Sequence, residues 1–422
     1  MKFIHAADLH IDSPLLGLEA YEGAPVERLR EATREAFGAL VSLAIEQTVD
    51  FVILAGDLFD GPWKDMKTGL WTAAQFRRLA TANGGIPVYI LRGNHDSASE
   101  VRKAVTWGEN VHEFSVRHPQ TFKLKDMGVA LHGQGFAKRD VPHDLTDNYP
   151  QPVEGMFNIG VLHTSLTGSS VHDTYAPTSP QKLAALGYDY WALGHIHRRD
   201  IVNDSSPVIA FSGNTQGRHI NESDAKGCWL VGVENGRIES MEFRATDVVR
   251  WRRLEIELDE NSGRAELLDM AGRRFHECHE QSEGRLAAVR LTVSGRTQLH
   301  AELTKHETRE ELLAELRNAA NHFDGEIWLE QIHLNTAPPI DRDKLKAGGD
   351  LLGELLRDID RLADNDELLA ETTRCLTPLM EKSPTELQHA NVDPQDQETM
   401  RRWLRQAEGL LLAHLADVED RG

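Results

Sequence analysis

The first 244 residues predict an α/β fold. Apolar segments of strand length alternate there with segments whose apolar residues recur at helical spacing. The first three predicted strands each lead into an acidic or polar cluster, and ligand sites of α/β sheets lie at the carboxyl ends of strands. With 422 residues the chain is too long for one ordinary core, so two or three domains are expected. The changes of pattern along the chain divide it into three, at 1–244, 245–335 and 336–422.

The apolar pattern assigns the elements of the first domain. Residues 51–55 form a continuous apolar run, as in strands buried on both faces, and residues 25–47 carry apolar side chains at helical spacing. The three prolines of segment 142–154 predict a surface loop. The other predicted elements are a helix at about 68–82 and strands at 2–7, 88–91, 129–132, 159–162, 190–193, 208–211, 228–233 and 238–243.

The pattern changes after residue 244 to that of a small α+β unit. Segment 336–341, with Pro338 and Pro339, resembles a linker, and segment 343–418 is predicted to be helical with breaks at prolines. The predicted elements of the α+β unit are strands at 254–258, 287–293 and 326–334 and helices at 265–281 and 307–320.

Charge and composition restrict the function. The formal net charge is −21, and each predicted domain has more acidic than basic residues. Since nucleic-acid binding depends on Lys and Arg neutralising phosphates, any phosphate-binding surface must be local or supplied by metal ions or a partner. No apolar run is long enough to span a membrane and no signal sequence is evident, which predicts a cytoplasmic protein. The cysteines, odd in number and far apart, indicate structural thiols.

Histidine and carboxylate residues predict a metal site. His195 and His197 follow the apolar run 190–193 and hold two imidazoles close together, and imidazole is the commonest neutral metal ligand. A set of carboxylate, amide and imidazole ligands without thiolate suits two divalent ions, with Mn²⁺ as the first choice and Fe²⁺ or Zn²⁺ as alternatives. One carboxylate would be shared by the two ions, and a metal-bound hydroxide would be the nucleophile. Each motif alone is weak, and His163 alone could be structural. The predicted ligands are Asp8, His10, Asp57, Asn94, His163, His195 and His197.

These motifs resemble the calcineurin-like metallophosphoesterase superfamily. The pattern is Asp-x-His at 8–10, Gly-Asp-x-x-Asp at 56–60, Gly-Asn-His-Asp at 93–96, a later histidine, and Gly-His-x-His at 194–197. The stretches 5–14, 188–197 and 213–222 are more specifically similar to its DNA-repair exonuclease branch, SbcD-like and closest to the YhaO type. The resemblance implies an αββα sandwich of two mixed sheets flanked by helices, with a small α+β cap domain and a helical C-terminal tail.

The resemblance also implies roles for the site residues. One metal would be held by Asp8, His10, Asp57 and His197, and the other by Asp57, Asn94, His163 and His195. His95 would assist the leaving 3′ oxygen, with Asp96 orienting its ring, or would be a structural imidazole beside the ligands.

Cationic residues give two candidate phosphate-binding groups. The first, near the metal edge in sequence, is Arg198, Arg199, Arg218 and His219. The second is Arg250, Arg252 and Arg253 beside Trp251, which could contact a phosphate and stack a base, or could simply begin a solvated strand.

The function expected from the resemblance is a metal-dependent DNA exonuclease or endonuclease. The helical tail would dock an SMC-like, SbcC-like ATPase, or would serve packing or homodimerisation. The alternatives are a metallophosphoesterase with a small-molecule or phosphoprotein substrate, and an adaptor that carries the fold to bind the ATPase.

Overall fold

The computed structural model describes residues 1–13, 23–60, 66–98, 105–166, 175–339, 342–374 and 396–419. The chain divides into two units. One comprises residues 1–253, 277–290 and 323–331, and the other comprises 254–276, 291–322 and 332–422. Across the described ranges, no helix combines the length and apolar composition needed to cross a membrane.

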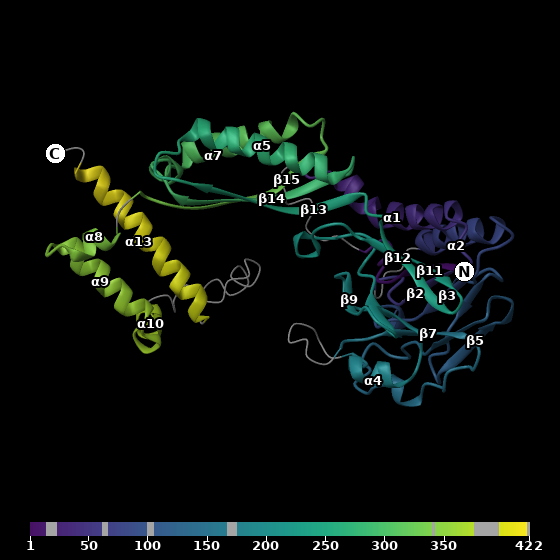
Figure 1. Cartoon of the computed structure of the whole chain (residues 1–422). Helices are drawn as coiled ribbons and strands as arrows, with labels where there is room; N and C mark the ends of the chain where they lie inside the picture. The colour runs from purple at the N-terminus through teal and green to yellow at the C-terminus, as the bar shows by residue number, and fades with distance from the viewer. Residues whose placement is uncertain are drawn as a thin grey trace. The chain divides into compact units, whose positions relative to one another are not determined.

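The first unit contains two mixed six-stranded sheets, one above the other in Figure 1. The first has the order β12-β11-β1-β2-β3-β4, in which β1 to β4 are parallel. Its strands are β1 (Lys2–Ala6), β2 (Phe51–Ala55), β3 (Val88–Leu91), β4 (Val111–Glu113), β11 (Gly227–Glu234) and β12 (Arg237–Ala245).

The second sheet has the order β5-β6-β7-β8-β10-β9, in which β6, β7, β8 and β10 are parallel. Its strands are β5 (Gln120–Leu124), β6 (Val129–Gly133), β7 (Phe157–His163), β8 (Tyr190–Gly194), β9 (Asp200–Asn203) and β10 (Val208–Phe211).

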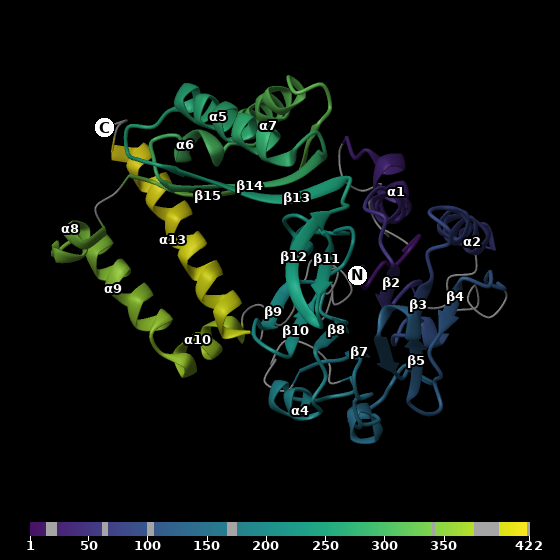
Figure 2. The ribbon, with the colours of Figure 1, turned by 45° about the vertical axis from the view of Figure 1, so that its right-hand side comes forward.

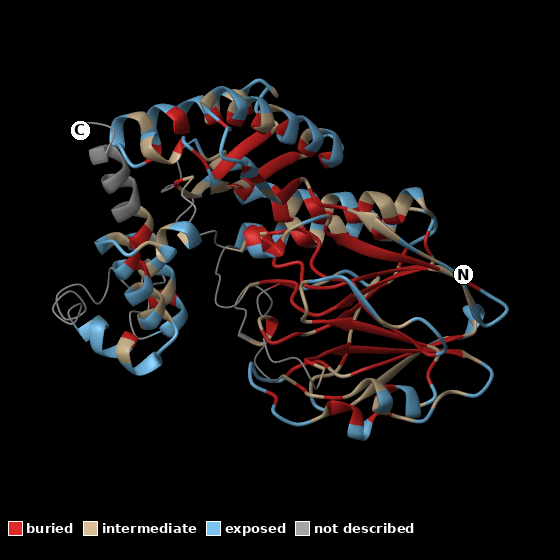
Figure 3. Cartoon of the chain, turned by 60° about the vertical axis from the view of Figure 1, so that its left-hand side comes forward, coloured by how far each residue is buried: buried red, intermediate tan, exposed pale blue. Residues whose placement is uncertain are grey.

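Helices cover the outer faces of the two sheets. Helices α1 (Val26–Glu46) and α2 (Met66–Thr81) pack on the first sheet, and α4 (Pro180–Ala185) on the second (Figure 2). Because strand side chains alternate, Ile4 of β1 faces the helices and Phe3 enters the core between the sheets. The buried residues follow both sheets as layers (Figure 3). The predicted αββα sandwich of two mixed sheets is confirmed.

A buried histidine links the two sheets. His5 of β1 is fully buried, with Nε2 3.1 Å from the carbonyl of Leu193 and Nδ1 2.9 Å from the hydroxyl of Tyr190. Since a carbonyl only accepts, Nε2 carries the proton and Nδ1 accepts from Tyr190. Burial lowers the pKa of His5 to about 3, against which the Leu193 hydrogen bond acts weakly. The folded protein therefore keeps this imidazole neutral.

The pH dependence of stability should reveal this link. Between pH 6.5 and about 3 the unfolded chain protonates His5 and the folded chain does not, so the free energy of unfolding falls as pH is lowered. His5→Gln keeps a donor and an acceptor but cannot titrate. We expect urea unfolding of the metal-free protein to be less pH-dependent in this variant, by up to about 1.4 kcal/mol per pH unit. Equal slopes for the variant and the wild type would contradict the assignment.

A third sheet, β13-β14-β15, follows the sandwich in sequence. Its strands extend beyond their predicted ends, and β15 includes the first residues of the predicted linker, of which residues 340 and 341 lie outside the described ranges. The elements are β13 (Val249–Leu258), α5 (Arg264–Ser282), β14 (Leu286–Arg296), α6 (His300–Leu303), α7 (His306–Asn321) and β15 (Ile327–Ala337).

The described part of the tail consists of helices joined by short non-helical segments. Arg342 bridges Asp360 and Glu408, which joins helices distant in sequence, while Pro378, Pro384 and Pro394 lie outside the described residues. The helices are α8 (Arg342–Ala347), α9 (Leu351–Ala363), α10 (Asp366–Thr373) and α13 (Gln397–Glu419).

Candidate metal centre

The ends of five parallel strands bring the predicted ligands together. Asp8 follows β1, Asp57 follows β2 and Asn94 follows β3, while His163 ends β7 and His195 follows β8. The parallel pairing within each sheet places these carboxyl ends along one edge. The structure thereby assembles, from both sheets, a cluster of residues that are up to 189 positions apart in the sequence.

Four of the predicted ligands have a left-handed backbone. The φ angles are 53° at Asp8, 44° at His10, 51° at Asp57 and 99° at His195. This conformation is uncommon for residues with a side chain, and it concentrates at functional sites. Hydrogen bonds between the loops hold it, since the amides of Asp8 and His10 donate to the carbonyls of Gly56 and Asp57, each at 3.0 Å.

Two glycines allow the close approach of the ligands. A Cβ at Gly93 would lie 2.2 Å from Oδ1 of Asp57, and a Cβ at Gly56, where φ is 108°, would lie 2.2 Å from Nδ1 of His163. Any larger residue would therefore displace a predicted ligand.

The first group of ligand atoms surrounds His163. Its Nε2 lies 2.9 Å from Oδ1 of Asn94 and 3.3 Å from Oδ2 of Asp57, while Nδ1 lies 3.0 Å from the carbonyl of Ala55. Because that carbonyl requires a proton on Nδ1, it is Nε2 that faces the two side-chain oxygens, and a bound metal would replace the proton held there. The ring of His195 lies beside it, with centroids 5.2 Å apart.

The second group surrounds His10. Its Nε2 lies 3.2 Å from Nε2 of His197 and 4.0 Å from Oδ2 of Asp57, and its buried Nδ1 makes no hydrogen bond among the described residues. The carboxylate of Asp8 accepts from the amide of His195 at 3.0 Å. The ligand atoms of Asp8, His10 and His197, and those of Asp8, Asp57 and His163, lie within 4.8 Å of one another in each set.

These groups fit divalent cations. Imidazole nitrogens that face each other, or that face a carboxylate and an amide oxygen, share a proton in the metal-free protein, and a bound cation would replace that proton and be held by both sides. Asp57 lies near His163 and His10, so it belongs to both groups. The donor set contains oxygen and nitrogen and no thiolate, as expected for Mn²⁺, Fe²⁺ or Zn²⁺.

Electrostatics keep Asp57 ionised. Burial favours its neutral form, but the charge and hydrogen bond of His163 outweigh burial and hold the pKa of Asp57 well below its ordinary value. Burial likewise opposes protonation of His163, yet Asp57 raises the pKa of that imidazole to about 9. At His10 burial dominates and lowers the pKa, so this ring stays neutral and able to bind a metal.

The carboxylate that contacts the ring of His95 is that of Asp60. The prediction that Asp96 orients this ring was wrong. Nδ1 of His95 lies 2.6 Å from Oδ1 of Asp60. The carboxylate of Asp96 instead accepts from three backbone amides, at 3.0 to 3.2 Å, and so fixes the loops after β2 and β3 to each other. These three backbone N–H groups satisfy the hydrogen-bonding capacity of the buried Asp96 carboxylate. The three amides belong to Leu58, Phe59 and Gly93.

Sequence reasoning also missed the role of Glu222. Its Oε1 lies 2.6 Å from Nδ1 of His197, and its Oε2 accepts from Nδ2 of Asn214 at 2.9 Å. A carboxylate on the far nitrogen of a ligand histidine fixes the ring and its tautomer. The sequence did contain a signal for each of these carboxylates. Asp60 is the second aspartate of the Gly-Asp-x-x-Asp motif, and Glu222 is the last residue of the stretch 213–222.

Removing the charge of Glu222 should weaken metal binding. In Glu222→Gln the amide can still accept from His197, but the ligand loses basicity, and we expect Mn²⁺ affinity to fall about 10- to 100-fold. Isothermal titration of the metal-free protein measures this, with the exposed Glu242→Gln as the control. Wild-type affinity in Glu222→Gln would contradict the role of this carboxylate.

The first group of predicted phosphate contacts separates in the structure. Arg218 lies in the site, 3.6 Å from Asp60. Arg199 stacks on Phe243, with its guanidinium carbon 3.9 Å from the ring centroid, and Arg198 is exposed. His219 is half-exposed, and its Nδ1 accepts from the backbone of the following helical turn.

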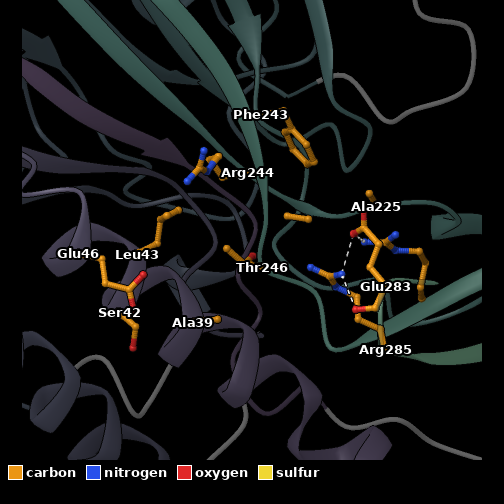
Figure 4. A pocket seen from close by; sticks show the side chains of 12 residues that line it. Ala39, Ser42, Leu43, Glu46, Ala225, Phe243, Arg244, Thr246, Glu283 and Arg285 are labelled. Atoms are coloured by element: carbon orange, nitrogen blue, oxygen red, sulfur yellow. Dashed lines mark hydrogen bonds and ion pairs between the residues drawn. The ribbon is translucent and has the colours of Figure 1, made fainter. Parts of the chain in front are cut away.

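The second cationic group is structural. Trp251 is buried and donates to the carbonyl of Gly217, so it cannot stack a base. Arg250 is buried on Asp247 and lines a cavity of about 640 Å³ (Figure 4), where it and Arg285 both contact Glu283. Arg252 pairs with Asp224, and Arg253 donates to Asn221.

The fold and site define a class. Two stacked α/β sheets with clustered Asp, Asn and His side chains at the carboxyl ends of their strands are the framework of a metal-dependent phosphoesterase. Comparison with known proteins agrees: residues 1–199 match the family model for calcineurin-like phosphoesterases, and residues 251–337 match the middle domain of metallophosphoesterase YhaO.

The chain belongs to the calcineurin-like metallophosphoesterase family, whose members are phosphoester hydrolases. It is 32% identical over 418 residues to the uncharacterized metallophosphoesterase YhaO of Bacillus subtilis (strain 168), covering 98% of each chain. It is 25% identical over 280 residues to the DNA double-strand break repair protein Mre11 of Thermoplasma acidophilum, covering 61% of this chain and 68% of the relative. The resemblance to the superfamily and to the YhaO type is thus confirmed.

Proposed function

We propose that this protein is a two-metal-dependent phosphodiesterase that acts on DNA, as an exonuclease or endonuclease in DNA repair. The observation that carries the proposal is the convergence of Asp, Asn and His side chains around Asp57, with imidazole nitrogens facing one another. The likeness to Mre11, named as a DNA double-strand break repair protein, supports DNA as the substrate.

The proposed metal ligands form two sets that share Asp57. When bound, two divalent ions supply the positive charge and the activated water that hydrolysis of a phosphodiester needs. Mn²⁺ is the proposed metal, with Fe²⁺ or Zn²⁺ as alternatives. One set is Asp8, His10, Asp57 and His197, and the other is Asp57, Asn94, His163 and His195.

His95 is the proposed proton donor to the leaving 3′ oxygen. Asp60 only accepts, so the proton on Nδ1 of His95 points to Asp60 and leaves Nε2 for the substrate. Burial opposes the imidazolium form, but the hydrogen bond with Asp60 and the charges of Asp57 and Asp60 raise the pKa of His95. The ring therefore holds a second proton more readily near neutral pH, as a general acid requires.

One assay tests the proposal against its alternatives. End-labelled single- and double-stranded DNA is incubated with the protein and Mn²⁺, in parallel with bis-p-nitrophenyl phosphate. Cleavage of DNA to 5′-phosphorylated products supports the nuclease. Turnover of the small diester that DNA ends do not inhibit indicates a small-molecule or phosphoprotein substrate, and no turnover of either indicates an adaptor.

A partner ATPase of the SMC type is proposed to dock on the helical tail. The net charge of −21 makes tight DNA binding by this chain alone unfavourable, because each neutralised phosphate needs a nearby cation. Helices α8 to α10 and α13 carry none of the proposed metal ligands. Arg342 of α8 pairs with α9 and α13, and Arg401 of α13 pairs with Asp366 of α10. Homodimerisation through the tail is the alternative.

Truncation after Pro339 separates the tail from the centre. We expect nearly unchanged Mn²⁺-dependent hydrolysis of bis-p-nitrophenyl phosphate, with loss of ATPase co-purification and of ATP-stimulated DNA processing. Co-purification of the truncated chain would place the docking surface elsewhere. Loss of small-substrate activity would mean that the tail belongs to the catalytic fold.

A further inference from the structure

Arg218 lies between two histidine–carboxylate pairs of the metal centre. One pair is His197 with Glu222, and the other is His95 with Asp60. The side chain of Arg218 is only 14% exposed. Burying a guanidinium is costly unless it is paired, so its position indicates a specific role.

The contact with Glu222 is extensive. The backbone amide of Arg218 donates to Oε2 at 2.8 Å, and its Nη2 donates to Oε1 at 2.9 Å. Since Nε2 of His197 faces the proposed metal, its Nδ1 carries the proton and donates to the same Oε1. Arg218 therefore holds the carboxylate of Glu222 in place, and that carboxylate in turn orients the ring of the proposed ligand His197.

The other arm of the guanidinium faces Asp60. Nη1 of Arg218 lies 3.6 Å from Oδ2 of Asp60 and 3.5 Å from Oγ of Ser13, and that hydroxyl donates to Oδ2 at 2.5 Å. The remaining oxygen, Oδ1, contacts Nδ1 of His95. One guanidinium thus contacts the carboxylates behind both His197 and His95.

We propose that Arg218 is a positioning residue that sets His197 and His95 relative to each other, and so couples metal binding to protonation of the leaving group. The inference rests on the proposed function for His95 and goes beyond it, because it assigns Arg218 to neither metal nor substrate. A planar fork can hold two carboxylates at once, which the single ammonium of lysine cannot do. The donors of Arg218 are directed at oxygens of Glu222, Ser13 and Asp60, and Nη2 also lies 3.2 Å from Nδ1 of His197. Protein groups thus occupy these donors, which argues against a phosphate contact.

The test measures metal affinity and turnover separately. In the full-length chain, Arg218→Gln is expected to lower Mn²⁺ affinity about 10- to 100-fold, through His197, and to lower kcat at saturating Mn²⁺ about tenfold, through His95. Arg218→Lys is expected to restore at most one of the two. Arg244→Gln, which removes an equal charge from an arginine paired with Glu242, should change neither.

Three outcomes overturn the proposal. Wild-type metal affinity with a raised KM in Arg218→Gln would make Arg218 a substrate contact. Full restoration of both quantities by lysine would show that charge suffices without the fork. Unchanged affinity and kcat would leave Arg218 no role. If the wild type hydrolyses no phosphodiester, the proposed function fails, and the metal titration, which needs no substrate, still decides whether Arg218 acts through Glu222.

Discussion

Replacing Asp57 by asparagine is expected to abolish phosphodiester hydrolysis and to reduce bound metal from two ions per chain to about one or fewer. Asp57 is the carboxylate shared by the two ligand groups, with Oδ2 3.3 Å from Nε2 of His163 and 4.0 Å from Nε2 of His10. His163 holds the pKa of Asp57 well below its ordinary value, so this side chain is a carboxylate whose negative charge an amide lacks. Elemental analysis of the purified variant measures the metal content.

The exposed residue Asp126 provides the matched control. Asp126→Asn removes the same charge far from the ligand groups in sequence and should keep both metal and activity. Thermal unfolding of the metal-free proteins separates loss of a ligand from loss of the fold. Retention of two ions per chain by a folded Asp57→Asn would disprove the bridging role.

The variant His95→Ala is expected to lower turnover about 100-fold or more with metal content unchanged, within the range of general acid catalysis. The backbone amide of His95, which donates to Oδ1 of Asp57 at 2.9 Å, survives this substitution, so the ligand geometry is preserved. Steady-state kinetics with bis-p-nitrophenyl phosphate at saturating Mn²⁺ measure the effect.

Asp60→Asn is the companion variant for His95. It keeps an acceptor beside Nδ1 but removes the charge that raises the pKa of the ring, so we expect a smaller loss of turnover than in His95→Ala. Loss of metal in His95→Ala would place His95 among the ligands, and wild-type turnover would exclude it as the acid.

Strands buried on both faces were predictable from sequence. Residues 51–55 are buried at every position. A strand buried on both faces is a continuous apolar run, which can be recognised without any alternation of apolar and polar residues. The strands that sequence reasoning missed are short or partly exposed, namely β4, β5 and β9. Their formation depends on pairing with neighbours that are set by tertiary structure, which local pattern does not encode.

The convergence of the predicted ligands was equally predictable, because a polar cluster after an apolar strand marks the carboxyl end of that strand. The hydrogen-bond partners of the histidines in the site were not predictable. Asp96 is adjacent to His95 in sequence, yet its carboxylate turns to the backbone, while Asp60, 35 residues away, reaches the ring. Such pairings depend on loop conformation, in particular the left-handed residues after β1 and β2.

The central position of β1 determines when this centre can form during synthesis. In the first sheet β1 lies between β2 and β11, and Lys2 pairs with Gly232, so β1 cannot complete its pairing until a residue 230 positions later has been translated. Such distant pairing is slow to form, and folding is correspondingly delayed. Asp8 and His10 emerge about 185 residues before His195 and His197. With the proposed ligand sets, metal binding would follow translation of His197, and bound metal would then stabilise the folded chain by mass action.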